Sequence, residues 1–364
     1  MTERWGACGW IARPPRDFLA PMEQRTPDAE AEIDHRWRMW IAENKIQNLD
    51  DRVVVDVLAR NGVPPPATVA ELKALYQHPY FQAAHNLQQL TRKLESILGV
   101  YRQLDALSPN AGQIERRRRI NRPEFLEEFY SRNRPLLLTQ MMKKWKALTA
   151  WTPDYLKEKL GDTEVEVQTG RESDPLFERN LEQHRERMPF AQYVDRVTEA
   201  GETNDFYMVA NNKNFDRSGP MQALIDDIIQ FPELIDARSW RDKMFFWYGP
   251  KGTITPVHHD PMNVLLCQVS GRKRVKLFSP DQTPFLYNYV GVFSEVDVEN
   301  PDLARYPLFR QARPLEFTLE PGEAVFIPVG WWHAVVSLEK SISVSMTHFA
   351  FPNTFNWQNP HLVR

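Results

Sequence analysis

The residues Thr255-Pro256-Val257-His258-His259-Asp260 predict a short β-strand with metal-binding side chains. In an extended strand successive side chains alternate between the two faces, so His258 and Asp260 point to one side and His259 to the other. One strand therefore offers an imidazole and a carboxylate together. On its own this spacing is common by chance, and a structural histidine near an aspartate is the more frequent explanation.

The residues that follow predict a β-rich region from about 244 to 350. Four stretches have the length, apolar content or alternation of strands, and two turn sequences separate them. The turns are Ser270-Gly271 and Glu320-Pro321-Gly322-Glu323, and the stretches are residues 263–269, 272–278, 324–328 and 341–349.

A third potential ligand, His333, lies in Gly330-Trp331-Trp332-His333, shortly after a strand that ends at Pro328. Proline is tolerated at the ends and edges of sheets, so His333 is expected at the rim of a sheet. Two histidines and one carboxylate on one face of a metal form the ligand set of non-haem Fe(II) oxygenases. Three coordination positions then stay open for a co-substrate and dioxygen.

Lys273 is predicted to point into the core. At a period of two it shares a strand face with Val275 and Leu277. Burying an ammonium without a partner is costly, so an inward lysine implies a nearby anion, either a protein carboxylate or a bound carboxylate ligand. A dicarboxylic co-substrate would fit. The alternative is a lysine at a strand end whose ammonium reaches back to solvent.

Five groups of residues, in this order along the chain, resemble the JmjC (cupin-like) 2-oxoglutarate oxygenases. They are Thr255–Asp260, Gly271–Arg274, Tyr287-Asn288-Tyr289, Val296-Asp297 with Asn300-Pro301-Asp302, and Ile327–His333. Within that family the pattern is similar to the asparaginyl hydroxylase that acts on hypoxia-inducible factor. The resemblance runs from about Ile114 to about Phe351. It implies a mainly β fold with flanking helices, built on a double-stranded β-helix (jelly-roll or cupin) core.

The resemblance also implies a role for each matching residue. The catalytic iron ligands would be His258, Asp260 and His333. Residues at positions that contact 2-oxoglutarate or lie near it would be Lys273, Thr255, Tyr207, Asn263 and His348. The last is the weakest match, because His348 stands where the asparaginyl hydroxylase has asparagine, and a slip in register would replace it with Thr347.

The implied activity is Fe(II)- and 2-oxoglutarate-dependent hydroxylation of a protein or peptide side chain, with 2-oxoglutarate converted to succinate and CO₂. Alternative substrates are a small molecule, such as an amino acid or natural product, or an N-methyl-lysine that is demethylated. An aspartate ligand, as opposed to glutamate, favours a hydroxylase. A cupin module that binds metal without turnover is the alternative outside enzymes.

The composition is that of an ordinary globular protein, with 42% hydrophobic and 26% charged residues. A net charge of −3 gives no reason to expect nucleic acid as a partner. Cys8 and Cys267 are the only cysteines, which excludes a disulfide framework or a zinc site of four thiolates. We find no signal peptide and no stretch of transmembrane length, and expect a cytoplasmic protein without membrane partners.

Three parts are expected: an irregular arm over residues 1–29, a helical domain over 30–107 and a catalytic domain over 113–364. Helices are predicted at about 28–44, 50–60 and 79–107, with a break at Gly62 and Pro64-Pro65-Pro66. The third helix carries an apolar stripe at alternating spacings of three and four. Its members are Tyr80, Ala83, Leu87, Leu90, Leu94, Ile97, Tyr101 and Leu104. Packing within the helical domain is the expected role of the stripe, and a homodimer interface is the alternative.

Some conspicuous residues are expected to be structural. The run Arg116–Arg119 predicts a solvated strand or helix start beside Glu115 more than a nucleic-acid contact. Trp145 and Trp151 are expected in the core, and His85 and His184 on the surface.

Overall fold

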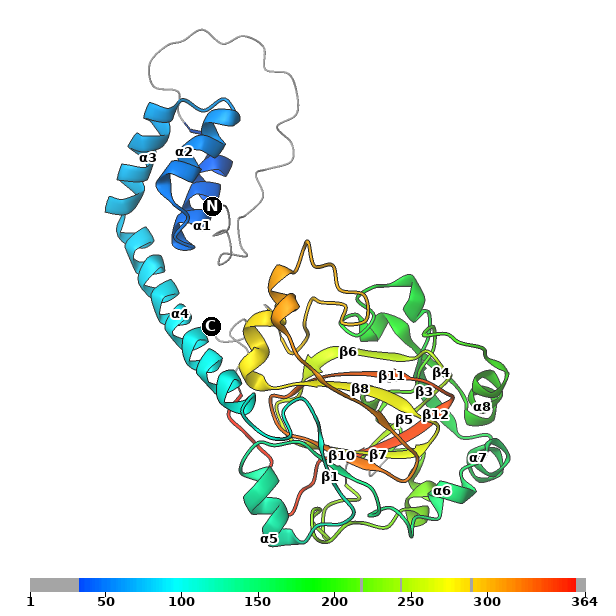
Figure 1. The fold of residues 1–364 in the computed structure, drawn as a ribbon. Coiled ribbons are helices and arrows are strands. Elements are labelled where there is room, and N and C mark those ends of the chain that lie inside the picture. The colour runs from blue at the N-terminus through cyan, green and yellow to red at the C-terminus, as the bar shows by residue number, and fades with distance from the viewer. Residues whose placement is uncertain (1–32, 217–218, 243, 289–290, 358–364) are drawn as a thin grey trace. The chain divides into compact units, whose positions relative to one another are not determined.

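The computed structural model describes residues 33–216, 219–242, 244–288 and 291–357. Contacts divide the chain into two units, Met1–Tyr101 and Arg102–Arg364 (Figure 1). The arm predicted over residues 1–29, together with Cys8 and Tyr289, lies outside the described residues. The domain boundaries expected at 30–107 and 113–364 stay predictions.

The N-terminal unit is helical, as the sequence predicts. Its helices are α1 (His35–Ile46), α2 (Asp51–Arg60), α3 (Pro65–Gln77) and most of α4 (Pro79–Asp105). Asp34 and Asp50 cap α1 and α2, each accepting a hydrogen bond from the backbone N–H two residues later. Helix α3 was not predicted from the sequence, because the three consecutive prolines were interpreted as the end of a helical region. Pro65 instead starts the helix, where a missing N–H costs nothing.

The core of this unit is formed by α1, α2 and α3. It includes Trp37, Trp40, Ile41, Leu58 and Leu72. In α4 the apolar stripe remains open to solvent: Leu87 is 67% exposed and Leu90 54%. The stripe therefore does not pack within this unit, in contrast to the expectation from the sequence.

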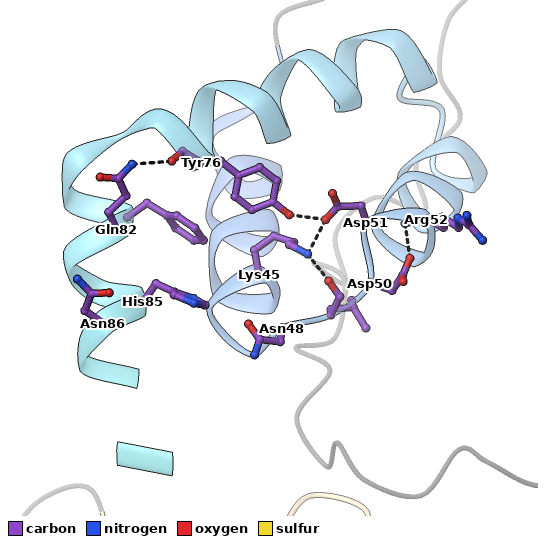
Figure 2. Close-up of a pocket in the computed structure, with 11 residues that line it drawn as sticks. Lys45, Asn48, Asp50, Asp51, Arg52, Tyr76, Gln82, His85 and Asn86 are labelled. Carbon is purple, nitrogen blue, oxygen red and sulfur yellow. Dashed lines mark hydrogen bonds and ion pairs between the residues drawn. The ribbon is translucent and has the colours of Figure 1, made fainter. Parts of the chain in front are cut away.

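A pocket of about 560 Å³ lies between α1, α2, α3 and the start of α4. Lys45 lies 2.5 Å from the Asp51 carboxylate across this pocket, and the Tyr76 hydroxyl donates to the same carboxylate (Figure 2). The ion pair with Asp51 and the contact with Tyr76 outweigh burial and raise the pKa of Lys45. These contacts tie the three helices together at the rim of the pocket.

The C-terminal unit, Arg102–Arg364, is built on two sheets that face each other (Figure 1). The first has the order β1 (Glu115–Arg117), β2 (Leu136–Leu138), β10 (Ala324–Ile327), β7 (Val264–Ser270), β12 (Ser341–Met346) and β5 (Met244–Gly249). The second has the order β6 (Ile254–His259), β11 (Trp332–Ser337), β8 (Lys273–Phe278) and β9 (Leu315–Leu319).

Apolar side chains from both sheets meet in one core cluster. Leu266 and Val325 come from the first sheet, and Val275, Leu277 and Val335 from the second. All pairs among β5 to β12 within these sheets are antiparallel. Two facing antiparallel sheets with a shared core are the jelly-roll arrangement, so the expected fold class is confirmed.

Helices and a small third sheet cover the outside of the first sheet. They are α5 (Arg122–Glu124), the π-helical turn Phe125–Tyr130, α6 (Ala147–Ala150), α7 (Pro153–Leu160), α8 (Phe190–Glu199), β3 (Glu164–Gln168) and β4 (Arg185–Pro189). Short 3₁₀ turns occupy Arg171–Ser173, Leu181–His184, Ala210–Asn212, Gln222–Asp227, Pro280–Phe285 and Pro307–Gln311. Trp145 and Trp151 are buried here, as expected. Across the described part of the chain, every helix is too short or too polar to span a bilayer.

One expectation about histidines is wrong. His184 is buried, and both of its ring nitrogens have partners. Its Nδ1 donates to the Thr169 carbonyl at 2.9 Å, and its Nε2 lies 3.1 Å from the Asp174 carboxylate. His85, on α4, is half-buried.

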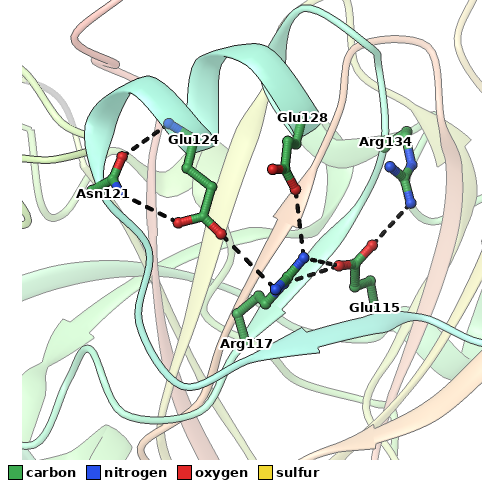
Figure 3. A network of polar contacts seen from close by, with 6 residues as sticks. All are labelled: Glu115, Arg117, Asn121, Glu124, Glu128 and Arg134. Carbon is green, nitrogen blue, oxygen red and sulfur yellow. Dashed lines mark hydrogen bonds and ion pairs between the residues drawn. The ribbon is translucent and has the colours of Figure 1, made fainter.

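The run Arg116–Arg119 begins in strand β1 of the C-terminal unit. Figure 3 shows Arg117 between the carboxylates of Glu115, Glu124 and Glu128, with Arg134 on the other oxygen of Glu115. These side chains are partly exposed, so each pair adds little stability. The prediction of a solvated strand start is confirmed.

Candidate active site

The structure brings His258, Asp260 and His333 together. One ligand atom from each lies within 4.8 Å of the other two. Nε2 of His333 is 3.6 Å from the Asp260 carboxylate, and the two imidazole rings lie 4.2 Å apart. His258 is directly opposite His333 in the antiparallel pairing of β6 with β11, which explains how two distant segments meet. The Gly330 N–H donates to the Asp260 carbonyl and ties the two segments further.

The two histidines are oriented by their own strands. Nδ1 of His258 lies 2.9 Å from the Pro256 carbonyl, and Nδ1 of His333 lies 3.1 Å from the Trp331 carbonyl. A carbonyl only accepts, so each Nδ1 carries the proton and each Nε2 presents a lone pair. Burial lowers the pKa of His333 to about 4, with a smaller contribution from His258. Neutral imidazoles are the form that binds metals.

Lys273 lies on the same interior face as these ligands. In the pairing of β8 with β11, His333 is opposite Leu277, Val335 is opposite Val275, and Ser337 is opposite Lys273. Paired residues share a face, so the lysine points between the two sheets. Its side chain is 2% exposed, which matches the inward direction expected from the period of two.

The Lys273 ammonium meets the hydroxyl of Tyr207, 3.0 Å away, which comes from a segment far from β8 in sequence. No carboxylate among the described residues forms an ion pair with this ammonium. Burial lowers the pKa of Lys273 to about 7. Burial also raises the pKa of Tyr207 well above its usual range, so its hydroxyl stays protonated. Lys273 and Tyr207 therefore form a buried, hydrogen-bonded pair of an amine and a hydroxyl.

Thr255 reaches the same face through a β-bulge. Strict alternation would place it beside His259, on the opposite side from His258. The pairing of β6 with β11 shifts register between His333 and Val335, however, so that Val335 lies opposite Thr255. One extra residue in β6 returns the Thr255 side chain to the interior face.

Asn263 makes a contact that the sequence did not indicate. Its side-chain oxygen accepts the Val329 N–H at 2.7 Å, and the residue is 1% exposed. Val329 lies in the loop that leads to His333. Asn263 is thus in contact with protein backbone and holds that loop.

Among the residues after β12, the geometry favours Thr347 over His348 as an inward side chain. Ser343 and Ser345 contact Gln268 and Trp247, and alternation continues from them to Thr347. His348 lies near Asp236, and its backbone carbonyl accepts the Asp236 N–H. A co-substrate role for His348 stays a prediction.

A buried ion pair beside Tyr207 was not predicted from the sequence. Arg171 is 1% exposed and donates to Glu178 at 3.0 Å and to the Ile254 carbonyl at 2.8 Å. Its guanidinium stacks between the rings of Phe177, at 4.3 Å, and Tyr207, at 5.2 Å. Burial raises the pKa of Glu178, and Arg171 and His258 oppose that rise.

Gln168 lies beside Tyr207 as well. It exchanges two backbone hydrogen bonds with Tyr207, so the two side chains share a face. Both atoms of its buried amide, and Nη1 of Arg171, lack partners among the described residues. Only the fold brings these groups together, so no local signal could have marked them.

Trp247, Asn212 and Tyr287 make side-chain contacts within the protein. The Trp247 indole donates to Ser345 on the interior face and lies 6.0 Å from the Tyr207 ring. By contrast, Asn212 caps the Val209 N–H, and the Tyr287 hydroxyl accepts the Leu308 N–H. The last two contacts stabilise loops.

A family model described as a cupin-like domain matches residues 122–353. The chain belongs to the cupin-like domain family. The resemblance to JmjC (cupin-like) proteins is thereby confirmed, and the likeness to the asparaginyl hydroxylase stays a similarity.

This cupin-like protein is similar to three curated relatives over part of its length. It is 32% identical to JmjC domain-containing protein D of Dictyostelium discoideum, over 62% of this chain and 55% of the relative. It is 33% identical to human tRNA wybutosine-synthesizing protein 5, over 62% and 75%. It is 32% identical to lysine-specific demethylase 8 of Danio rerio, over 61% and 54%. The match therefore spans about half to three quarters of these relatives.

A solved structure of YcfD, a ribosomal oxygenase from Escherichia coli in complex with cobalt and 2-oxoglutarate, also matches this cupin-like protein. The TM-score is 0.39 with 19% identity, over 65% of this chain and 53% of that one.

Proposed function

We propose that this protein is an Fe(II)- and 2-oxoglutarate-dependent oxygenase that hydroxylates a protein or peptide side chain. One observation carries the proposal: a His-Asp-His trio shares an interior face with a buried lysine that forms no ion pair with any described residue. Metal ligands and an unpaired buried cation together suit a metal-bound dicarboxylate.

The donor set fits iron. His258 and His333 would bind through Nε2, because each Nδ1 is engaged by a carbonyl, and Asp260 would bind through its carboxylate. Two imidazoles and one carboxylate leave the metal open on one side, which a structural site of four ligands does not.

Lys273 and Tyr207 would receive the distal carboxylate of 2-oxoglutarate, with Thr255 on the same face. A carboxylate there satisfies the buried ammonium, which favours binding. Fe(II) and 2-oxoglutarate are the cofactors. When bound, and with dioxygen as the oxidant, they would supply the chemistry that puts one oxygen atom into a C–H bond to give C–OH and the other into succinate as 2-oxoglutarate loses CO₂. The protein would orient the two imidazoles through backbone carbonyls and keep the Lys273 ammonium away from bulk water.

A protein or peptide is the preferred substrate, since lysine-specific demethylase 8 is among the relatives and the aspartate ligand favours hydroxylation. Transfer RNA is the second substrate class, because a relative of similar identity is named a tRNA wybutosine-synthesizing protein. The absence of a nucleic-acid partner, expected from the net charge, therefore stays open to test.

The first experiment tests the site. Purified protein with Fe(II) is expected to convert 2-oxoglutarate to succinate without added substrate, and Mn(II) is expected to raise its melting temperature. His258→Ala and Asp260→Ala should abolish both effects. His259→Gln is the matched control, because this side chain lies on the opposite face against Trp332. Metal stabilisation without succinate would identify a binding module instead.

The second experiment tests the substrate. A peptide array, total transfer RNA and a panel of amino acids are incubated with enzyme and cofactors, and products are weighed by mass spectrometry. A gain of one oxygen on peptides supports the proposal. Release of formaldehyde from methylated peptides would indicate demethylation. Oxidised transfer RNA or a free amino acid, without peptide products, would replace the proposed substrate class.

A further inference from the structure

Helix α4 presents an apolar stripe that the described protein leaves uncovered. Seven of its members are large side chains, and each is at least 45% exposed. Across the 27 residues of α4, Phe81 is the one buried side chain. Phe81 lies outside the stripe and packs in the N-terminal unit.

A helix of this kind has little stability of its own in water, since helices in proteins are stabilised mainly by packing of an apolar face. The stripe on α4 is narrow and repeats strictly every seven residues over four heptads. A narrow stripe at a period of 3.5 suits another helix with the same repeat, whereas a helix that packs on a globular core has a broader apolar face.

A second copy of this helix supplies the matching surface and enough area. The exposed fractions correspond to roughly 600–700 Å² of apolar surface per copy. The stripes of two copies together offer more apolar surface than the ~1,000 Å² that a specific interface buries. No charged side chain occupies a position of the stripe, so full burial leaves no unpaired charge.

Charges beside the stripe favour a parallel arrangement. In a parallel pair in register, Lys93 lies beside Leu98 of the other copy, and its stem can cover that side chain. In the antiparallel register that aligns all eight stripe positions, the two Lys93 side chains oppose each other across the interface. Like charges there are unfavourable.

We propose that this protein forms a homodimer through a parallel coiled coil of α4 with α4 of a second copy. The interface is independent of the proposed oxygenase activity. It concerns helix α4, which carries none of the residues proposed for the oxygenase site, so a failed activity test would leave it unchanged.

Sedimentation equilibrium on the full chain tests the proposal. The wild-type protein is expected at twice the monomer mass of 42.6 kDa. Leu90→Glu with Leu94→Glu should give a monomer with unchanged succinate formation. Gln89→Glu with Ser96→Glu adds the same charge on α4 outside the stripe and should remain a dimer. A monomeric wild-type protein, as would result if another part of the chain covered the stripe, overturns the proposal.

A cross-link tests which surfaces meet and in which direction. In a Cys8→Ser background, Leu90→Cys places one thiol at the centre of the stripe, while Cys267 stays buried. A parallel pair should form a disulfide between the two copies on mild oxidation, seen as a covalent dimer on a non-reducing gel. The background protein should remain unlinked. A dimer that forms no such disulfide would overturn the parallel coiled coil.

Discussion

The ammonium of Lys273 lies 3.0 Å from the hydroxyl of Tyr207, between the two facing sheets. Because burial lowers the pKa of this lysine to about 7, its charge is only half retained near neutral pH. An anion bound beside the ammonium would raise that pKa again. Binding of a dicarboxylate and protonation of Lys273 are therefore coupled.

The affinity for 2-oxoglutarate should fall as the pH rises through about 7. Below that pH the free protein already holds the ammonium, whereas above it binding must take up a proton, which costs free energy. We expect the Kd to rise on the order of tenfold between about pH 7 and 8.5. Calorimetric titration of the Mn(II)-loaded protein with 2-oxoglutarate measures this dependence.

Lys273→Arg is the control, because a guanidinium stays charged over the whole range. Its Kd can differ from that of the wild-type protein, but it should be nearly independent of pH. An equal pH dependence in both proteins would assign the titration to another group and contradict the prediction.

Arg171 is predicted to position Tyr207. The guanidinium stacks on the tyrosine ring and is anchored by Glu178 and the Ile254 carbonyl. Removing one member of a buried pair leaves an unpaired charge, so both are changed together in Arg171→Met with Glu178→Gln. We expect the KM for 2-oxoglutarate to rise about tenfold with little change in kcat, measured by succinate formation.

Arg196→Met is the matched control for this pair. Its guanidinium stacks 4.2 Å from the ring of Phe206, the residue before Tyr207. The KM for 2-oxoglutarate should stay at the wild-type value. The positioning role is refuted if the two proteins show the same change, or if the double variant loses kcat at unchanged KM.

The His258-Asp260 pair and the inward lysine could be predicted from sequence because strand alternation is a local property. The spacing of His258 and Asp260 alone places them on one face. Lys273 shares a strand face with Val275 and Leu277, whose side chains lie in the core. Helix α3 was missed for a local reason as well, since Pro65 was taken as a break when it fits the first helical turn.

The rest of the site depends on register and tertiary contacts. Alternation alone misplaces Thr255, because the bulge that returns it to the interior depends on how β6 pairs with β11. Arg171 and Glu178 are polar residues in a loop, where sequence favours solvent exposure. They become part of the site only because the fold brings them against Tyr207 and near His258.

Asn263 is predicted to stabilise the loop that carries His333. Its buried oxygen accepts the Val329 N–H, and Asn263→Ala would leave that donor unsatisfied at a cost of about 1–3 kcal/mol. Because Val329 lies four residues before His333, the free energy of unfolding and the affinity for Mn(II) should fall together. Asn211→Ala, at an exposed asparagine, should change neither. Denaturant unfolding and metal titration measure the two quantities. A variant that loses stability but binds Mn(II) as tightly as the wild-type protein would show that the loop is held independently of the metal ligands.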